Sequence, residues 1–227
     1  MAPRASLESR IVDAVIERAQ CVGWGNVRLH DIADTLGRSP VDVRRHFRDL
    51  DAVADAWFAR ADAAMLAVRD RQGFAALTPK ERVSTVMWQW LESQSAEREV
   101  VRDMLAAKLY PGHPHHNIAL VLALSRTVQW VREAAHLDGV GRRRQIEEIG
   151  LTALFVSTVV LWLRDESEGQ TRTRQFLERS LSSADRLMAE LFAKSRDEKK
   201  GNSVRGGQPA GRSTEPAKRS GRHSRDR

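Results

Sequence analysis

The side chains best suited to binding phosphate or the edge of a base lie close together, between Ser39 and Arg48. Arg44, Arg45 and Arg48 carry planar guanidinium groups, which form paired hydrogen bonds with phosphate and with guanine. Ser39 and Pro40 come just before them and have the residue types that favour the first turn of a helix. Asp42 completes a Ser-x-x-Asp variant of the capping box and places a carboxylate at the positive end of that helix. The spacing predicts a short, capped helix with an exposed arginine face.

A second short helix must precede this one, and its single apolar face carries Leu29, Ile32, Ala33 and Leu36. Gly37 stands where the first helix needs a left-handed stop, which a residue without Cβ adopts at no steric cost. Val43 and Phe47 are four residues apart and are expected to point inward. Two short helices around a glycine turn, with arginines on the second, predict a helix-turn-helix.

The overall charge supports this interpretation less than it first suggests. The 227 residues carry 37 Lys and Arg and 30 Asp and Glu, a net charge of +7. Residues 196–227 hold 10 of the basic and 4 of the acidic residues, a net of +6, which leaves 37 − 10 = 27 and 30 − 4 = 26 in the rest, a net of +1. Within the first 50 residues the balance is eight to seven. The helix-turn-helix prediction therefore rests on its geometry, and the basic tail is either a solvated extension or an additional contact to DNA.

Composition and cysteine usage predict a cytoplasmic location. Hydrophobic content of 41% and charged content of 30% are typical of a soluble globular protein. A single cysteine, Cys21, excludes an internal disulfide and suits a reducing compartment. No signal peptide begins the sequence, and the longest uncharged run, Ile149–Leu163, is shorter than the roughly 20 residues of a spanning helix. We expect that run to be a buried helix and the chain to have no membrane span.

Apolar periodicity predicts an all-α protein of roughly nine helices, three in a head and six in a bundle. We expect helices over 7–22, the helix-turn-helix, and then 50–70, 79–95, 97–109, 115–136, 142–164 and 171–193, with Asp49 and Thr78 as helix caps. The long 50–70 helix joins the head to the bundle. The predicted domains are a DNA-binding head over 1–52, a ligand-binding and dimerisation bundle over 53–195, and a disordered basic tail over 196–227.

The head resembles the DNA-binding domain of TetR-type transcriptional repressors over nearly 50 residues without a gap. The matching positions are Ile11, Ala14, Ala19, Gly23, Trp24, Asp31–Ala33, Gly37, Ser39, His46–Phe47 and Asp51–Val53. Val43-Arg44 replaces the family's usual Leu-Tyr pair, and Arg38 replaces a small apolar residue. The resemblance implies a homodimer that binds a palindromic operator in double-stranded DNA. The expected DNA surface comprises Arg28, Ser39, Pro40, Val41, Asp42, Arg44, Arg45, His46 and Arg48.

Within that surface we expect Arg44 and Arg45 to contact bases, Arg28 and Arg48 to contact phosphates, and Ser39 and Asp42 chiefly to cap the helix. Dimerisation is expected through residues 142–193. A small apolar or lipid-like effector entering the bundle would tilt the 50–70 helix and change the separation of the two heads.

The C-terminal region is similar to a different branch of the same fold, the ubiquinone-biosynthesis lipid-binding family (the ninth coenzyme-Q protein and its bacterial relatives). The residues that carry this resemblance are Trp162-Leu163, Asp165, Ser167, Phe176-Leu177 and Arg179. It implies an apolar pocket, for which the candidates are Met87, Trp88, Trp90, Met104, Trp130, Phe155 and Trp162. The alternative for these residues is plain core, and the alternative function is a lipid- or isoprenoid-binding accessory protein of quinone biosynthesis with a vestigial helix-turn-helix.

No arrangement of residues predicts catalysis, a metal site or a cofactor. His113, His115 and His116 lack carboxylate or cysteine partners nearby, so a polar surface loop is expected there rather than a metal site. Asp165 and Glu166 are adjacent, diverge on a helix, and are expected to end it rather than to act as an acid and base. Gly-x-Ser-x-Gly and phosphate-binding glycine loops are missing from the sequence. We therefore expect a protein that is not an enzyme.

Overall fold

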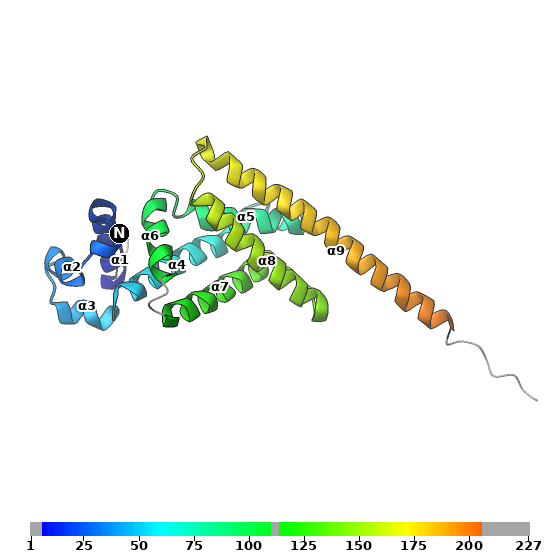
Figure 1. Cartoon of the computed structure of the whole chain (residues 1–227), viewed down its shortest axis with the longest axis horizontal. Helices are drawn as coiled ribbons and strands as arrows, with labels where there is room; N and C mark the ends of the chain where they lie inside the picture. The colour runs from blue at the N-terminus through cyan, green and yellow to red at the C-terminus, as the bar shows by residue number, and fades with distance from the viewer. Residues whose placement is uncertain (1–5, 110–113, 206–227) are drawn as a thin grey trace, which may run out of the picture. The chain divides into compact units, whose positions relative to one another are not determined.

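The computed structural model describes residues 6–109 and 114–205, with side chains for 6–109 and 122–191, and this part of the chain is helical without any strand (Figure 1). Its α-helices are α1 (Leu7–Val22), α2 (Leu29–Thr35), α3 (Pro40–His46), α4 (Leu50–Leu66), α5 (Pro79–Glu92), α6 (Arg98–Lys108), α7 (Pro114–Ala134), α8 (Gly141–Trp162) and α9 (Thr171–Arg205). Short 3-10 turns occupy Trp24–Asn26, Ala67–Asp70, Phe74–Ala76 and Glu168–Gln170. The all-α prediction and the predicted order of helices are confirmed.

The chain divides within α9 into two compact units, 1–185 and 186–227, and the first unit contains two hydrophobic cores. The head core joins α1, α2 and α3 to the beginning of α4 and to Val100 and Met104 of α6. The bundle core joins the later part of α4 to α5, α7, α8 and the first turns of α9. Because α4 contributes to both cores, the predicted domain boundary between residues 52 and 53 falls inside a shared helix.

Helix ends follow the capping residues expected from the sequence. The Asp49 carboxylate accepts a hydrogen bond from the Ala52 amide and begins α4. Thr78 and Glu81 form a complete capping box at α5, in which each side chain accepts from the other's backbone amide. Two ends differ from expectation. The α4 helix ends at Leu66 and tightens into a 3-10 turn before Gly73, and α9 continues to Arg205 instead of ending near residue 193.

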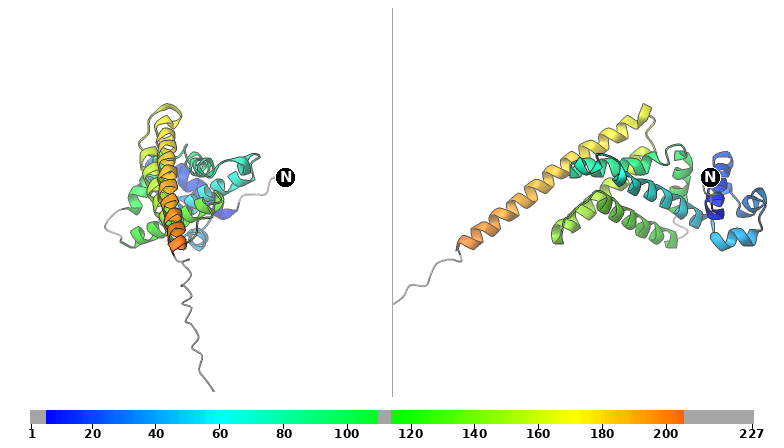
Figure 2. Two further views of the ribbon diagram at one scale, coloured as in Figure 1. Left: turned by 90° about the vertical axis from the view of Figure 1, so that its right-hand side faces the viewer. Right: turned by 180° about the vertical axis from the view of Figure 1, so that it is seen from behind.

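The α8 helix is apolar on two sides, of which only one is buried. Phe155, Val159 and Trp162 belong to the bundle core, where α8 packs on α5 and α7 (Figure 2). The opposite side exposes Ile146, Ile149, Val156 and Val160. Among the described residues α8 is the one helix long and apolar enough to cross a membrane, with a mean hydropathy of 1.3, a test that core helices of soluble proteins also pass. The sequence predicted a buried helix over Ile149–Leu163, but within one copy of the chain only one side of α8 is buried.

Several expectations concern residues outside the described part. Residues 110–113 include His113, and the predicted basic tail beyond residue 205 also lies outside it. Among the described residues no group of three or more His, Cys, Asp or Glu side chains is placed to hold a metal ion.

Candidate nucleic-acid interface

The turn between α2 and α3 is shaped by its backbone. Gly37 has φ of +60°, the left-handed conformation that the sequence predicted. Its amide donates to the Asp34 carbonyl at 3.0 Å, and the Arg38 amide donates to the Ala33 carbonyl at 2.9 Å. These two bonds satisfy carbonyls that the end of α2 would otherwise leave without partners. The turn therefore sets the direction in which α3 leaves α2.

The first turn of α3 is held by Ser39 and Asp42. The Ser39 hydroxyl accepts from the Asp42 amide at 3.1 Å and donates to the Asp42 carboxylate at 2.8 Å, while Pro40 occupies the first turn. The Ser39 hydrogen bond lowers the pKa of the Asp42 carboxyl below its ordinary value, and the nearby charges of Arg45 and Arg38 act in the same direction. Asp42 is therefore anionic at neutral pH, at the positive end of the helix.

The two faces of α3 differ as predicted. Val43 and Phe47 are buried in the head core. The other face exposes Arg44, Arg45 and His46, with Arg48 just past the end of the helix. In the described part of the chain Arg44 has no hydrogen-bond or salt-bridge partner.

The other two arginines have acidic partners on the surface. Arg45 pairs with Asp42 at 3.2 Å, and Arg48 pairs with Asp49 at 3.1 Å. Exposed pairs of this kind contribute little to stability, so they are readily exchanged for a phosphate or a base edge. The three arginines therefore present an exposed and adaptable cationic surface.

Arg28 lies apart from this group. It is the residue before α2, and its guanidinium donates to the carbonyls of Gly25 at 3.1 Å and Val27 at 3.2 Å. No side chain caps the N-terminus of α2. The structure thus groups Ser39–Arg48 on one element and places Arg28 at the start of another, where it also supports its own loop.

The predicted ligand pocket is not gathered into one cavity. Met87, Trp90, Phe155 and Trp162 are buried in the bundle core, where the Trp90 ring lies 5.0 Å from that of Phe155. Met104 lies instead in the head core, because α6 packs against α1 and α4. The remaining two differ again: Trp88 is partly buried under the Arg174 guanidinium at 3.9 Å, and Trp130 is 48% exposed.

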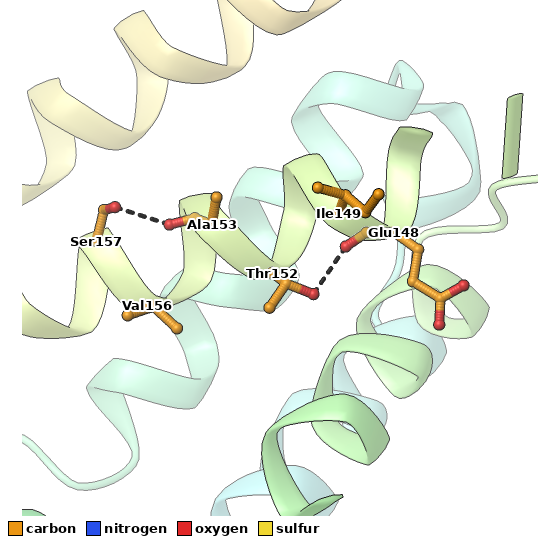
Figure 3. Close-up of a pocket in the computed structure, with 6 residues that line it drawn as sticks. All are labelled: Glu148, Ile149, Thr152, Ala153, Val156 and Ser157. Carbon is orange, nitrogen blue, oxygen red and sulfur yellow. Dashed lines mark hydrogen bonds between the residues drawn. The ribbon is translucent and has the colours of Figure 1, made fainter. Parts of the chain in front are cut away.

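Two hollows lie elsewhere on the surface. One, of ≈ 510 Å³, follows the exposed side of α8 and is lined by Glu148, Ile149, Thr152, Ala153, Val156 and Ser157 (Figure 3). The other, of ≈ 410 Å³, is lined by Gln129, Trp130, Arg132, Glu133 and Arg144. Of the predicted pocket residues, only Trp130 lines one of these two hollows, the second. Most of the others pack in the two hydrophobic cores.

A buried lysine, which the sequence analysis did not single out, joins the head to α6. The Lys108 side chain is 3% exposed, and its ammonium lies 2.5 Å from Asp51 and 2.9 Å from Asp55 of α4. Lys108 follows Met104 by four residues and therefore lies on the apolar face of α6. The sequence could have indicated this lysine as a charged residue on an otherwise apolar helical face. It could not have indicated its partners, which are more than 50 residues away along the chain.

The other side of α6 holds the end of α8. Arg98 donates to the Asp165 carbonyl at 2.5 Å, and Arg102 donates to the Leu163 carbonyl at 2.6 Å. These carbonyls follow the last turn of α8, where backbone acceptors lack helical partners. The same helix that reaches the head through Lys108 therefore also anchors the turn between α8 and α9.

Asp165 organises that turn. Its carboxylate accepts four hydrogen bonds, from the amides of Ser167 (2.9 Å) and Thr173 (2.8 Å) and from their hydroxyls (2.6 and 2.7 Å). Burial raises the pKa of Asp165, but the hydrogen bonds from Ser167 and Thr173 outweigh burial and hold the pKa well below its ordinary value. Glu166 beside it is exposed. Asp165 thus has a structural role in the turn, and the two carboxylates do not form an acid and base pair.

Comparison with known proteins identifies the family. The chain is similar to the crystal structure of a TetR transcriptional regulator from Nitrosomonas europaea, with 41% identity and a TM-score of 0.70 over 79% of this chain and 98% of that one. It is also similar to the crystal structure of a TetR transcriptional regulator from Rhodococcus sp. RHA1, with 16% identity and a TM-score of 0.59 over 77% of this chain and 92% of that one. At this identity the likeness is one of fold alone. No curated protein matches. The chain belongs to the TetR family of transcriptional regulators.

The second resemblance is also confirmed. A family model described as COQ9 matches residues 148–188. The matched segment contains most of α8, the turn organised by Asp165, and the first part of α9. Trp162 and Leu177, two residues of the motif, are buried in the bundle core, and a third, Asp165, holds the turn. Much of the motif is therefore accounted for by packing and capping.

Proposed function

We propose that this TetR-family chain represses transcription by binding a palindromic DNA operator as a homodimer and that a small apolar effector releases it. The observation that supports DNA binding most directly is the α3 surface. Its backbone is fixed by Gly37, Ser39 and Pro40, and its outer face exposes Arg44, Arg45 and Arg48. A rigid, capped helix with mobile guanidinium groups matches the requirements of the major groove.

The test is a binding titration with the DNA upstream of the chain's own gene. A good arginine–guanine contact contributes about 1–3 kcal/mol, so Arg44→Ala/Arg45→Ala should weaken binding by more than about 30-fold. Arg10→Ala/Arg18→Ala is the matched control, because both arginines are exposed on α1 of the same head. Equal binding of the Arg44/Arg45 variant and wild type at moderate salt would contradict the proposal.

The exposed side of α8 supports dimerisation. Ile146, Ile149, Ala153, Val156 and Val160 follow one another at spacings of three and four residues, the repeat of a helix that packs on another helix. Ala153 has the smallest side chain of this row and, with Ile149 and Val156, lines the hollow whose side chains are drawn in Figure 3. A second copy of α8 would offer larger side chains of the same row to that hollow. In the adjoining unit, α9 exposes Leu187 and Leu191.

Sedimentation measurements test the dimer. Ile149 belongs to this row and is 72% exposed in one copy of the chain. Ile149→Glu therefore places a charge within the row and should shift the chain to a monomer. Leu122→Glu on α7 is the control, because Leu122 is also more than half exposed but lies outside the row. A wild-type chain that remains monomeric at micromolar concentration would contradict this part of the proposal.

The contacts of α6 support a route for the effector's action. Lys108 ties α6 to the beginning of α4, and Arg98 and Arg102 tie it to the end of α8. An effector that binds one arrangement of the bundle more tightly shifts the population toward that arrangement, and α4 carries the change to the head. The effector's energy comes from the difference between its affinities for the two arrangements.

One observation favours a second function, which is lipid or isoprenoid binding in quinone biosynthesis with a vestigial head. The COQ9 model matches residues 148–188, and the apolar row on α8 lies partly within that segment. Native mass spectrometry of the purified chain distinguishes the two functions. A retained isoprenoid, together with no selective DNA binding, would support the lipid-binding protein, whereas a ligand-free dimer that binds DNA would support the regulator.

A further inference from the structure

The exposed face of α3 has an apolar side chain among its arginines. Val41 is 60% exposed, although the head core of the same domain buries other valines almost completely. Arg44 and Arg45 follow Val41 by three and four residues, so they flank it on the helix surface. Val43 and Phe47 fill the opposite, buried face. Val41 therefore contributes little to the core and lies at the centre of the surface that would face a ligand.

The position of the Val41 methyl groups is well fixed. Pro40 and the Ser39 cap hold the first turn of α3, and a valine in a helix has one strongly preferred rotamer. Arg45 lies one helical turn further along the same surface, where it pairs with Asp42 at 3.2 Å. An exposed apolar group at a fixed position, between two guanidinium groups, is complementary to an apolar group on the partner.

The major groove offers one such group, the C5-methyl of thymine. We propose that Val41 packs on a thymine methyl in each operator half-site, next to guanine contacted by Arg44 or Arg45. This inference rests on the proposed DNA-binding function and adds a specificity determinant to it. It predicts that the half-site contains a thymine beside a guanine and that the methyl group itself, not only the A·T pair, is recognised.

The experiment uses the full-length chain and begins by selecting preferred duplexes from a randomised pool. Each thymine of the enriched half-site is then replaced singly by deoxyuridine, which removes only the methyl group. Burial of one methyl group corresponds to a loss of about three- to tenfold in affinity, and we expect it at one position per half-site. Val41→Ala should lower affinity for the thymine duplex by a similar factor and leave affinity for the deoxyuridine duplex nearly unchanged.

Val140→Ala is the matched control, because Val140 is 79% exposed and lies outside the head. It should show the same thymine preference as wild type. The inference is overturned if wild type binds thymine and deoxyuridine duplexes equally at every position, or if Val41→Ala keeps the full preference. If the chain did not bind specific DNA at all, the result would differ, because wild type would then enrich no sequence from the pool.

Discussion

Replacing Asp165 by asparagine tests the structural role of the turn between α8 and α9. Four hydrogen bonds reach the Asp165 carboxylate, two on each oxygen, and the residue is 2% exposed. Asparagine keeps one acceptor oxygen, and its NH₂ group faces donors at the other position. Hydrogen bonds to a charged group contribute about 1.5–3 kcal/mol each, so the loss of two should lower the free energy of unfolding by about 3 kcal/mol. For a chain of this length that corresponds to a decrease in Tm of about 6–12 °C.

Thermal and chemical unfolding measure this effect, with Glu166→Gln as the control. Glu166 is the neighbouring carboxylate and is exposed, so its neutralisation should change stability by less than about 0.5 kcal/mol. If Asp165→Asn and Glu166→Gln unfolded at the same temperature, the hydrogen bonds around Asp165 would not stabilise the turn.

The pH dependence of the stability of wild type and Asp165→Asn provides an independent check. Because the pKa of Asp165 is lower in the folded chain than its ordinary value of 3.8, its stabilising contribution is complete above that pH. The contribution is lost as the pH falls toward the folded-state pKa. The stability difference between wild type and Asp165→Asn should therefore be constant from about pH 5 to 8 and should shrink in strong acid.

Three further substitutions test other parts of the fold by chemical unfolding. Lys108→Met should cost about 3 kcal/mol because it leaves the largely buried carboxylate of Asp51, 13% exposed, without its lysine partner, and adding Asp51→Asn should recover much of the loss. Gly37→Ala should cost about 1 kcal/mol through its positive φ alone, since a Cβ there meets no neighbour, whereas Gly25→Ala should cost less because Gly25 has no positive φ. Burial raises the pKa of Asp62 above its ordinary value of 3.8 despite hydrogen bonds from two neighbours, so wild type should lose stability relative to Asp62→Asn as the pH rises above that value.

Local features of the fold were predictable because they depend on residues close in sequence. The stop at Gly37, the Ser39 cap and the capping box at Thr78 each involve partners three to five residues apart. The inward direction of Val43 and Phe47 follows from helical periodicity alone. The backbone of the candidate DNA surface could therefore be predicted almost completely.

Features that depend on which helices are neighbours could not be predicted in the same way. Periodicity showed that Met104 lies on an apolar face but not that this face packs into the head core. The same limit applies to Lys108, whose partners in α4 are 53 and 57 residues away. The seven residues predicted to line a pocket were grouped by residue type, and the fold places them in different surroundings for the same reason.

The TetR and COQ9 resemblances do not compete, because they concern different physical features. The COQ9 match covers an α8–turn–α9 segment, whose recognisable residues include Trp162 and Leu177 in the core and Asp165 in the turn. Packing and capping account for these residues, so the match alone does not decide between the two proposed functions. The residues that do separate them are in α3. Arg44 and Val41 are exposed there without a role in packing the head, and a vestigial head would have no need to keep a capped helix beneath them.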